Sequence, residues 1–177
     1  MLADWEIRQL MAEGAIVLKP GPVDYDIQPA SIDVHLGRSF AMPKEGQRPK
    51  LIGPMPRMYN DPDEPDEMER VEDKDSVVLF PHAFMLAALA ENLKLGHDVA
   101  ARLEGKSKLA RMGLAVHITA GFVEPGWDGI LTLELFNFSP RPIMLRAGMA
   151  VAQLTFELVG GTRGVSRSYG HPELKNH

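Results

Sequence analysis

Glycine and proline divide this chain into short apolar segments, and that spacing constrains the fold more than any other feature of the sequence. The 177 residues include 16 glycines and 14 prolines, and most apolar runs between them have the length of a strand. Only residues 4–13 and the turn at 106–111 show helical spacing. Short strands separated by Gly and Pro are typical of β-barrels and jelly rolls. We therefore expect an all-β protein, a distorted jelly roll or β-barrel with a short N-terminal helix.

The N-terminal helix is expected over residues 4–13, with Asp4 as its N-cap and Gly14 at the C′ position. Ile7, Leu10 and Met11 would form its apolar stripe. We expect one domain over 1–177, with a Pro- and acid-rich excursion at 42–75 and a flexible tail at 160–177. Strands are expected at 16–18, 27–36, 77–80, 84–90, 130–136, 143–145 and 151–158, and a turn followed by a strand is expected within 95–103.

The composition excludes several classes of protein. Hydrophobic residues make up 45% of the chain, yet no apolar run is long enough to span a membrane. The first ten residues, MLADWEIRQL, lack the basic and then apolar segments of a secretory signal, so we expect a cytoplasmic protein that does not bind membranes. There is no cysteine, which excludes disulfides, a thiol nucleophile and a Cys-ligated zinc.

Charge is distributed unevenly along the chain. Residues 61–75 hold nine acids and two bases, a net of −7, and since the whole chain carries −5 the remainder carries +2. A mildly basic remainder fits a small anionic ligand. A nucleic-acid-binding domain usually shows a stronger basic stripe, so we expect no nucleic-acid partner.

A basic turn lies in the middle of the chain, in the segment GKSKLAR. The turn contains Lys106, Ser107, Lys108 and Arg111, and the last three are spaced so that their side chains can converge on one helical turn. Cations and a hydroxyl that follow Gly105 suit a polyphosphate ligand. A solvated basic surface is the alternative interpretation, and it is the commoner origin of such a pattern.

One carboxylate occurs in the apolar segment 130–136. Alternation places Leu131, Leu133 and Leu135 on one face and Glu134 on the other. A carboxylate on a strand this apolar usually has an ion-pair partner or a chemical role. Both roles remain open for Glu134 from the residues alone.

Four motifs in this order resemble the dCTP deaminase branch of the dUTPase-like superfamily. They are the turn GKSKLAR, the corner TAGFVEPGW, the strand LTLELFN and the turn RAGMAVAQLTF, and the early segment IQPASIDVHLG also matches. The resemblance covers nearly the whole chain. It departs from the family at Lys108, where a second Ser is usual, and at Glu124, where Asp is usual.

The resemblance implies a homotrimer of dUTPase-like barrels whose active sites are shared between subunits. It implies hydrolytic deamination of dCTP to dUTP, with Mg²⁺ bound to the substrate triphosphate and no zinc. Glu134 would be the catalytic acid and base, assisted by Ser107 and Arg111. Substrate contacts are implied for Lys106, Ser107, Lys108, Leu109, Ala110, Arg111, Ala120, Glu124, Thr132, Leu133, Gln153 and Tyr169.

The chemistry agrees with these residues. Deamination of cytosine needs water at C4 and protons for N3 and for the departing ammonia, and one carboxylate can transfer all of them. Zinc deaminases instead use cysteine ligands, which this chain lacks. The backbone of 117–120 beside Gly121 could read the pyrimidine edge, and Trp127 could pack on the sugar or fill the corner.

Three alternatives remain from the sequence. Glu124 precedes Pro-Gly in the corner, where a carboxylate can activate water for attack on the α-phosphate. The chain could therefore be a bifunctional deaminase and dUTP diphosphatase, or a dUTP diphosphatase alone. A nucleotide-sensing trimer without catalysis is the third alternative, although a sensor would not need Glu134, Ser107 and Arg111 together.

Overall fold

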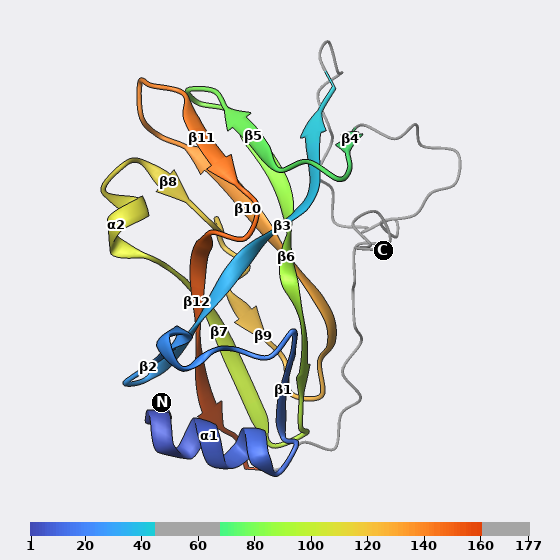
Figure 1. Cartoon of the computed structure of the whole chain (residues 1–177), viewed down its shortest axis with the longest axis vertical. Helices are drawn as coiled ribbons and strands as arrows, with labels where there is room; N and C mark the ends of the chain where they lie inside the picture. The colour runs from blue at the N-terminus through green and yellow to red at the C-terminus, as the bar shows by residue number, and fades with distance from the viewer. Residues whose placement is uncertain (45–67, 161–177) are drawn as a thin grey trace, which may run out of the picture.

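The computed structural model describes residues 1–44 and 68–160, and these form a mostly β structure (Figure 1). Its helices are α1 (Asp4–Ala12), the 3-10 turn η1 (Asp24–Asp26) and the short α2 (Ser107–Ala110). The strands are β1 (Ile16–Lys19), β2 (Ile27–Gln28), β3 (Ser31–Pro43), β4 (Met68–Val71), β5 (Ser76–Leu79), β6 (Phe84–Leu95), β7 (Val99–Gly105), β8 (Leu114–Ala115), β9 (Phe122–Val123), β10 (Asp128–Asn137), β11 (Ile143–Arg146) and β12 (Ala150–Leu158). The all-β prediction with one short N-terminal helix is confirmed.

One curled sheet contains most of the strands. Its hydrogen-bonded path runs β8-β10-β6-β3-β12-β7-β9, with β1, β2 and β4 attached to its inner members, while β5 and β11 pair separately. The long strands β3, β6 and β10 run along much of the long axis, β12 occupies the half nearer α1, and α1 lies at the end opposite β5 and β11 (Figure 1). Because β8 and β9 terminate the path, the sheet has a seam between its two ends.

The core lies inside this curled sheet. The alternation predicted for residues 130–136 is confirmed, since Leu131, Leu133 and Leu135 are buried. Phe40 of β3 and Phe156 of β12 are among the largest fully buried side chains. Burying such side chains removes about 1.5–3 kcal/mol of unfavourable hydration each, so the strands that carry the candidate site rest on a rigid support.

Helix α1 begins with a different cap from the one predicted. Ala3 is the N-cap, and the Glu6 carboxylate accepts a hydrogen bond from the Ala3 N–H at 2.8 Å. Asp4 is instead the first helical residue, because the capping acceptor comes from the third helical position. The predicted helix end is confirmed, since Gly14 follows it with φ +77°, a conformation that glycine adopts without strain.

The expectation of an irregular excursion at 42–75 is wrong at both of its described ends. Strand β3 continues to Pro43, and β4 pairs back on it, with Phe40 opposite Val71. Arg38 of β3 forms ion pairs with Asp73 and Asp75, which follow β4, and these pairs hold the segment after β4 against β3. The two carboxylates, Asp73 first, raise the pKa of Arg38. Residues 45–67 and the tail at 161–177 lie outside the described residues.

No helix among the described residues is both long enough and apolar enough to cross a membrane.

Candidate active site

Glu134 is half-buried on β10, and main-chain groups of the loop that follows β8 hold it in place. Its Oε2 accepts a hydrogen bond from the Ile118 N–H at 2.9 Å. Its own N–H donates to the Val116 carbonyl at 3.1 Å. Within the described part of the chain no hydrogen bond reaches Oε1. One carboxylate oxygen is therefore anchored, and the other has no hydrogen-bond partner among the described residues.

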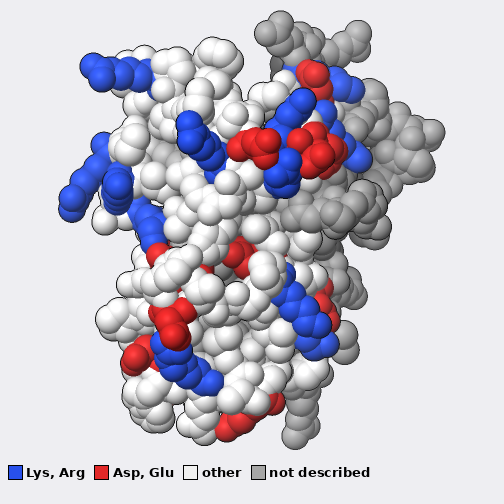
Figure 2. All heavy atoms as spheres, in the orientation of Figure 1, with Lys and Arg blue, Asp and Glu red and all other residues white. Residues whose placement is uncertain are grey.

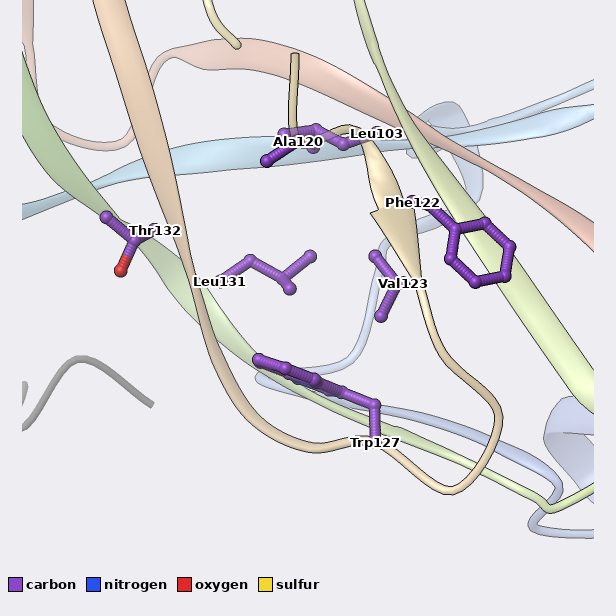
Figure 3. A pocket seen from close by; sticks show the side chains of 7 residues that line it. All are labelled: Leu103, Ala120, Phe122, Val123, Trp127, Leu131 and Thr132. Atoms are coloured by element: carbon purple, nitrogen blue, oxygen red, sulfur yellow. The ribbon is translucent and has the colours of Figure 1, made fainter. Parts of the chain in front are cut away.

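A hollow of about 200 Å³ lies at the seam of the sheet, and Thr132, two residues before Glu134 on β10, is one of its lining residues (Figure 3). Side chains of β10 and β9 face one another across it, and Trp127 lies along one side (Figure 3). The loop 116–121 leads from β8 to β9, so it passes Glu134 at Ile118 and reaches the hollow at Ala120. The lining residues are Leu103, Ala120, Phe122, Val123, Trp127, Leu131 and Thr132.

The corner 121–127 shapes the hollow. Trp127 donates its indole N–H to the Gly129 carbonyl at 3.0 Å and packs against the core, so it both fills the corner and lines the hollow. A Cβ on Gly121 would lie 3.0 Å from the Leu103 carbonyl oxygen. Glycine thus lets the loop approach β7 without a tight contact at this point. Glu124 is exposed at the same corner, and its main-chain carbonyl accepts a hydrogen bond from the main-chain N–H of Trp127.

The basic turn is a short helix, as its spacing predicts. Ser107, Lys108 and Arg111 are exposed, and among the described residues none of the three forms an ion pair. Basic side chains project from the edge of the molecule where α2 lies (Figure 2). Lys106, for which the resemblance implies a substrate contact, pairs its ammonium group with the Asp33 carboxylate on β3.

The structure does not bring Ser107 and Arg111 together with Glu134 in one copy of the chain. No hydrogen bond or ion pair among the described residues joins either side chain to the carboxylate. Helix α2 packs near β8, which pairs with β10 at Phe136 and Asn137, beyond Glu134. A single copy therefore presents the carboxylate and the basic turn as two separate features.

The other residues singled out from the sequence have varied surroundings. Ala120 and Thr132 line the hollow, and their contact with a substrate stays a prediction. Leu133 is fully buried, so only its main chain could reach a ligand. The Gln153 amide is bonded at both ends, to Ser31 and to Gly105. Tyr169 lies outside the described residues. Leu109 packs against the core, while Ala110 is exposed.

Sequence reasoning missed two contributors to this region. The Ile118 N–H orients the carboxylate, and a main-chain donor leaves no trace in residue identity. Asp33 pairs with Lys106, and the sequence does contain a pattern that marks Asp33 as a polar residue on a strand. In the segment SIDVHL, polar Ser31 and Asp33 alternate with fully buried Ile32 and Val34. That pattern marks a polar face on a strand whose other face is core.

Comparison with known proteins agrees with the resemblance. A family model described as dCTP deaminase-like matches residues 1–159. A Methanobrevibacter smithii protein named "dCTP deaminase, dUMP-forming" is 36% identical over 173 residues, which are 98% of this chain and 87% of that protein. A Rhodospirillum rubrum "dCTP deaminase" is 39% identical over 158 residues, 88% of this chain and 81% of that protein.

A solved structure points to the same family. The 2′-deoxycytidine 5′-triphosphate deaminase from Agrobacterium tumefaciens superposes with a TM-score of 0.64 at 26% identity, covering 89% of this chain. This chain spans only 47% of the length of that solved chain. The family model and the relatives, each matched over most of their length, nevertheless agree with one another. The chain belongs to the dCTP deaminase-like family.

Proposed function

We propose that this protein catalyses the hydrolytic deamination of dCTP to dUTP and ammonia. The observation that carries the proposal is Glu134, a half-buried carboxylate with one oxygen anchored by the Ile118 N–H and the other without a partner in residues 1–44 and 68–160. It lies two residues along β10 from Thr132, about 7 Å at the rise of a strand, and Thr132 lines the hollow. Family membership and the names of the relatives support the choice of substrate.

The reaction needs one carboxylate to move protons in sequence. Glu134 takes a proton from water as the water oxygen bonds to C4 of cytosine, and it delivers that proton to N3. A second proton passes from the new hydroxyl through Glu134 to the amino group, and the C4–N4 bond breaks as ammonia leaves. N3 keeps its proton and C4 becomes the carbonyl of uracil. Such proton transfers contribute typically 10²–10⁴-fold in rate.

Ser107 and Arg111 complete the site from a second copy of the chain in this proposal. Ser107 would hold the water or the departing amine, and Arg111 would stabilise charge on Glu134 or on the intermediate. Both side chains are exposed and unbonded to Glu134 within one copy. Beside α2, Met112 and Phe138 are 54% and 66% exposed, and their burial in a contact between copies would be favourable. A homotrimer with shared sites follows from the family resemblance.

Mg²⁺ enters the proposal with the substrate, because phosphate oxygens and water are its usual ligands. The exposed cations Lys108 and Arg111 suit the remaining charge of the triphosphate. Turnover should therefore require Mg²⁺ and should persist in protein freed of zinc by a zinc-selective chelator. Loss of activity that zinc alone restores would contradict the glutamate mechanism. A cytoplasmic location remains a prediction from the sequence.

A second candidate function is further hydrolysis of dUTP to dUMP and pyrophosphate. Two observations favour it: the Methanobrevibacter relative is named as dUMP-forming, and Glu124 is an exposed carboxylate at the corner of the hollow. Glu124 would activate water at the α-phosphate, while Glu134 would transfer protons at the cytosine ring. The two reactions would then share one bound nucleotide.

One assay tests both candidates. The purified protein is incubated with dCTP, CTP or dUTP and Mg²⁺, with ammonia measured enzymatically and nucleotides separated by chromatography over time. Ammonia released from dCTP with stoichiometric uridine nucleotide supports deamination. No ammonia from dCTP under conditions where the protein is folded would refute the proposal. Pyrophosphate formed in step with ammonia identifies the bifunctional enzyme.

A further inference from the structure

Side chains on two strands hold the residues that lead into the basic turn. We call Ser31, Asp33 and Gln153 the strand bracket. Gln153 of β12 stands opposite Asp33 of β3 in the sheet register. Its Nε2 donates to the Gly105 carbonyl at 3.3 Å, while its Oε1 accepts from the Ser31 hydroxyl at 3.1 Å. Asp33 accepts from the ammonium group of Lys106. Gly105 is thus held by its main chain and Lys106 by its side chain.

The Asp33–Lys106 pair is largely shielded from water. The side chains are 12% and 27% exposed, respectively. An ion pair in such surroundings interacts more strongly than an exposed pair, and either charge left alone there would be costly. Lys106 is therefore committed to Asp33, and the free positive charge of the turn belongs to Lys108 and Arg111.

The same bracket determines where α2 begins. The Lys106 carbonyl accepts the N–H groups of Leu109 and Ala110 at 2.9 and 3.0 Å, so Lys106 is the residue on which the helical turn is built. Four residues are too few to form a stable helix without tertiary support. Fixing Gly105 and Lys106 to the sheet supplies that support.

We propose that Asp33 is a positioning residue for the nucleotide reaction. It holds Lys106 against β3, so that Lys106 acts through this contact and is not itself a phosphate ligand. With Gln153 it orders the basic turn before the nucleotide arrives, and Ser107, Lys108 and Arg111 are presented without further ordering. Preorganisation of this kind lowers the entropic cost of binding and alignment. The inference rests on the proposed function.

A double-mutant cycle measures the coupling between Asp33 and Lys106. The variants are Asp33→Asn, Lys106→Gln and the pair together, with kcat and KM measured for dCTP deamination. Each single change should lower kcat/KM by at least about tenfold, the scale of small misplacements at a site, and the double variant should be no worse than either. If Lys106→Gln costs a further tenfold in the Asp33→Asn background, Lys106 binds the phosphates directly and the proposal is overturned.

Hydrogen exchange of the nucleotide-free protein gives a readout that does not depend on activity. In Asp33→Asn the amides of residues 109–111 should exchange faster than in the wild type, because their acceptors in the basic turn lose support. Asp24→Asn is the matched control, since it removes a carboxylate from the exposed Arg8–Asp24 pair, 3.1 Å long, and should change neither exchange in the turn nor kcat/KM. Unchanged exchange in Asp33→Asn would overturn the inference.

The outcomes separate this inference from the proposed function. A wild-type protein that releases no ammonia contradicts the function, while the exchange measurement still tests the strand bracket. If Asp33→Asn folds poorly because Lys106 is left unpaired, the double variant leaves no buried charge alone. Faster exchange at 109–111 in that variant supports the bracket, and wild-type exchange refutes it.

Discussion

At the scale of single residues, Glu134 carries the proposed chemistry, and its replacement by Gln is the most direct test. Gln can still accept the Ile118 N–H through its amide oxygen, so folding and nucleotide binding should be retained. The proton carrier is lost, and deamination should fall by at least about 10²-fold. Glu13→Gln, at the exposed end of α1, is the control and should behave as wild type. Near wild-type ammonia release from Glu134→Gln would assign catalysis elsewhere.

Glu124 decides a finer point, the product that leaves. The family usually has Asp at this corner, and one extra methylene displaces a carboxylate by roughly 1 Å, which can cost about 10²-fold in rate. We therefore expect dCTP to give mainly dUTP, with pyrophosphate released slowly or not at all. Glu124→Asp should then raise diphosphatase activity and leave ammonia release unchanged. Wild-type protein that forms dUMP as fast as ammonia would contradict this reasoning.

Individual residues also show what the sequence can and cannot predict. The position of Glu134 on the face of β10 opposite the buried leucines could be predicted, because strand alternation is local and the leucines are where it places them. The pairing of Lys106 with Asp33 could not, since 73 residues separate them in the chain. Their contact depends on β12 lying between β3 and β7 in the sheet, and that order is a property of the folded molecule.

At the scale of elements, β3 has one position, Gly37, where the neighbouring strand β6 leaves no room for a side chain. The pairing of β3 with β6 shifts register between Leu36 and Phe40, and a Cβ on Gly37 would lie 2.8 and 2.9 Å from the carbonyl oxygens of Ala88 and Leu89. Those oxygens belong to the backbone of β6, which cannot move away without disturbing its strand pairing. Element boundaries from the sequence were close for α1 and β10, whereas the extension of β3 to Pro43 was missed because prolines there suggested a loop.

Gly37→Ala should therefore destabilise the protein by about 1–3 kcal/mol, the usual cost of overpacking. Chemical denaturation with a strand-sensitive signal measures the change in the free energy of unfolding. Gly21→Ala is the matched control, because the nearest atom to its Cβ would be 3.8 Å away, and its stability should stay close to wild type. Equal stabilities of the two variants would show that β3 and β6 can separate at this point without cost.

At the scale of the whole molecule, the separation of Glu134 from the basic turn predicts complementation between inactive variants. Glu134→Gln supplies an intact turn and Arg111→Ala supplies an intact carboxylate. If each site combines the two features from neighbouring copies, mixed trimers of the two variants should recover about a quarter of wild-type activity, the fraction of interfaces with both groups intact in a random closed assembly. Each variant alone should remain inactive.

The complementation is measured after the two variants are refolded together at equal concentration, with size-exclusion chromatography and light scattering on the same samples. Variants refolded separately and then mixed without exchange are the control. A trimer that recovers no activity would place Arg111 and Glu134 of one copy at the same site. A monomer with wild-type activity would contradict shared sites altogether.

The seam beside β10 has a consequence for how a nucleotide could enter. Where the sheet would otherwise close, individual hydrogen bonds take the place of a strand ladder: Ile118 N–H to Glu134, and Leu103 N–H to the Gly121 carbonyl at 2.7 Å. We expect this loop, which is held at only a few points, to move more easily than the paired strands when a pyrimidine binds. The Ile118 amide proton is consequently a natural spectroscopic reporter. Its resonance senses the Glu134 carboxylate directly and should shift when substrate displaces or protonates that group, with the core amides of β10 unmoved.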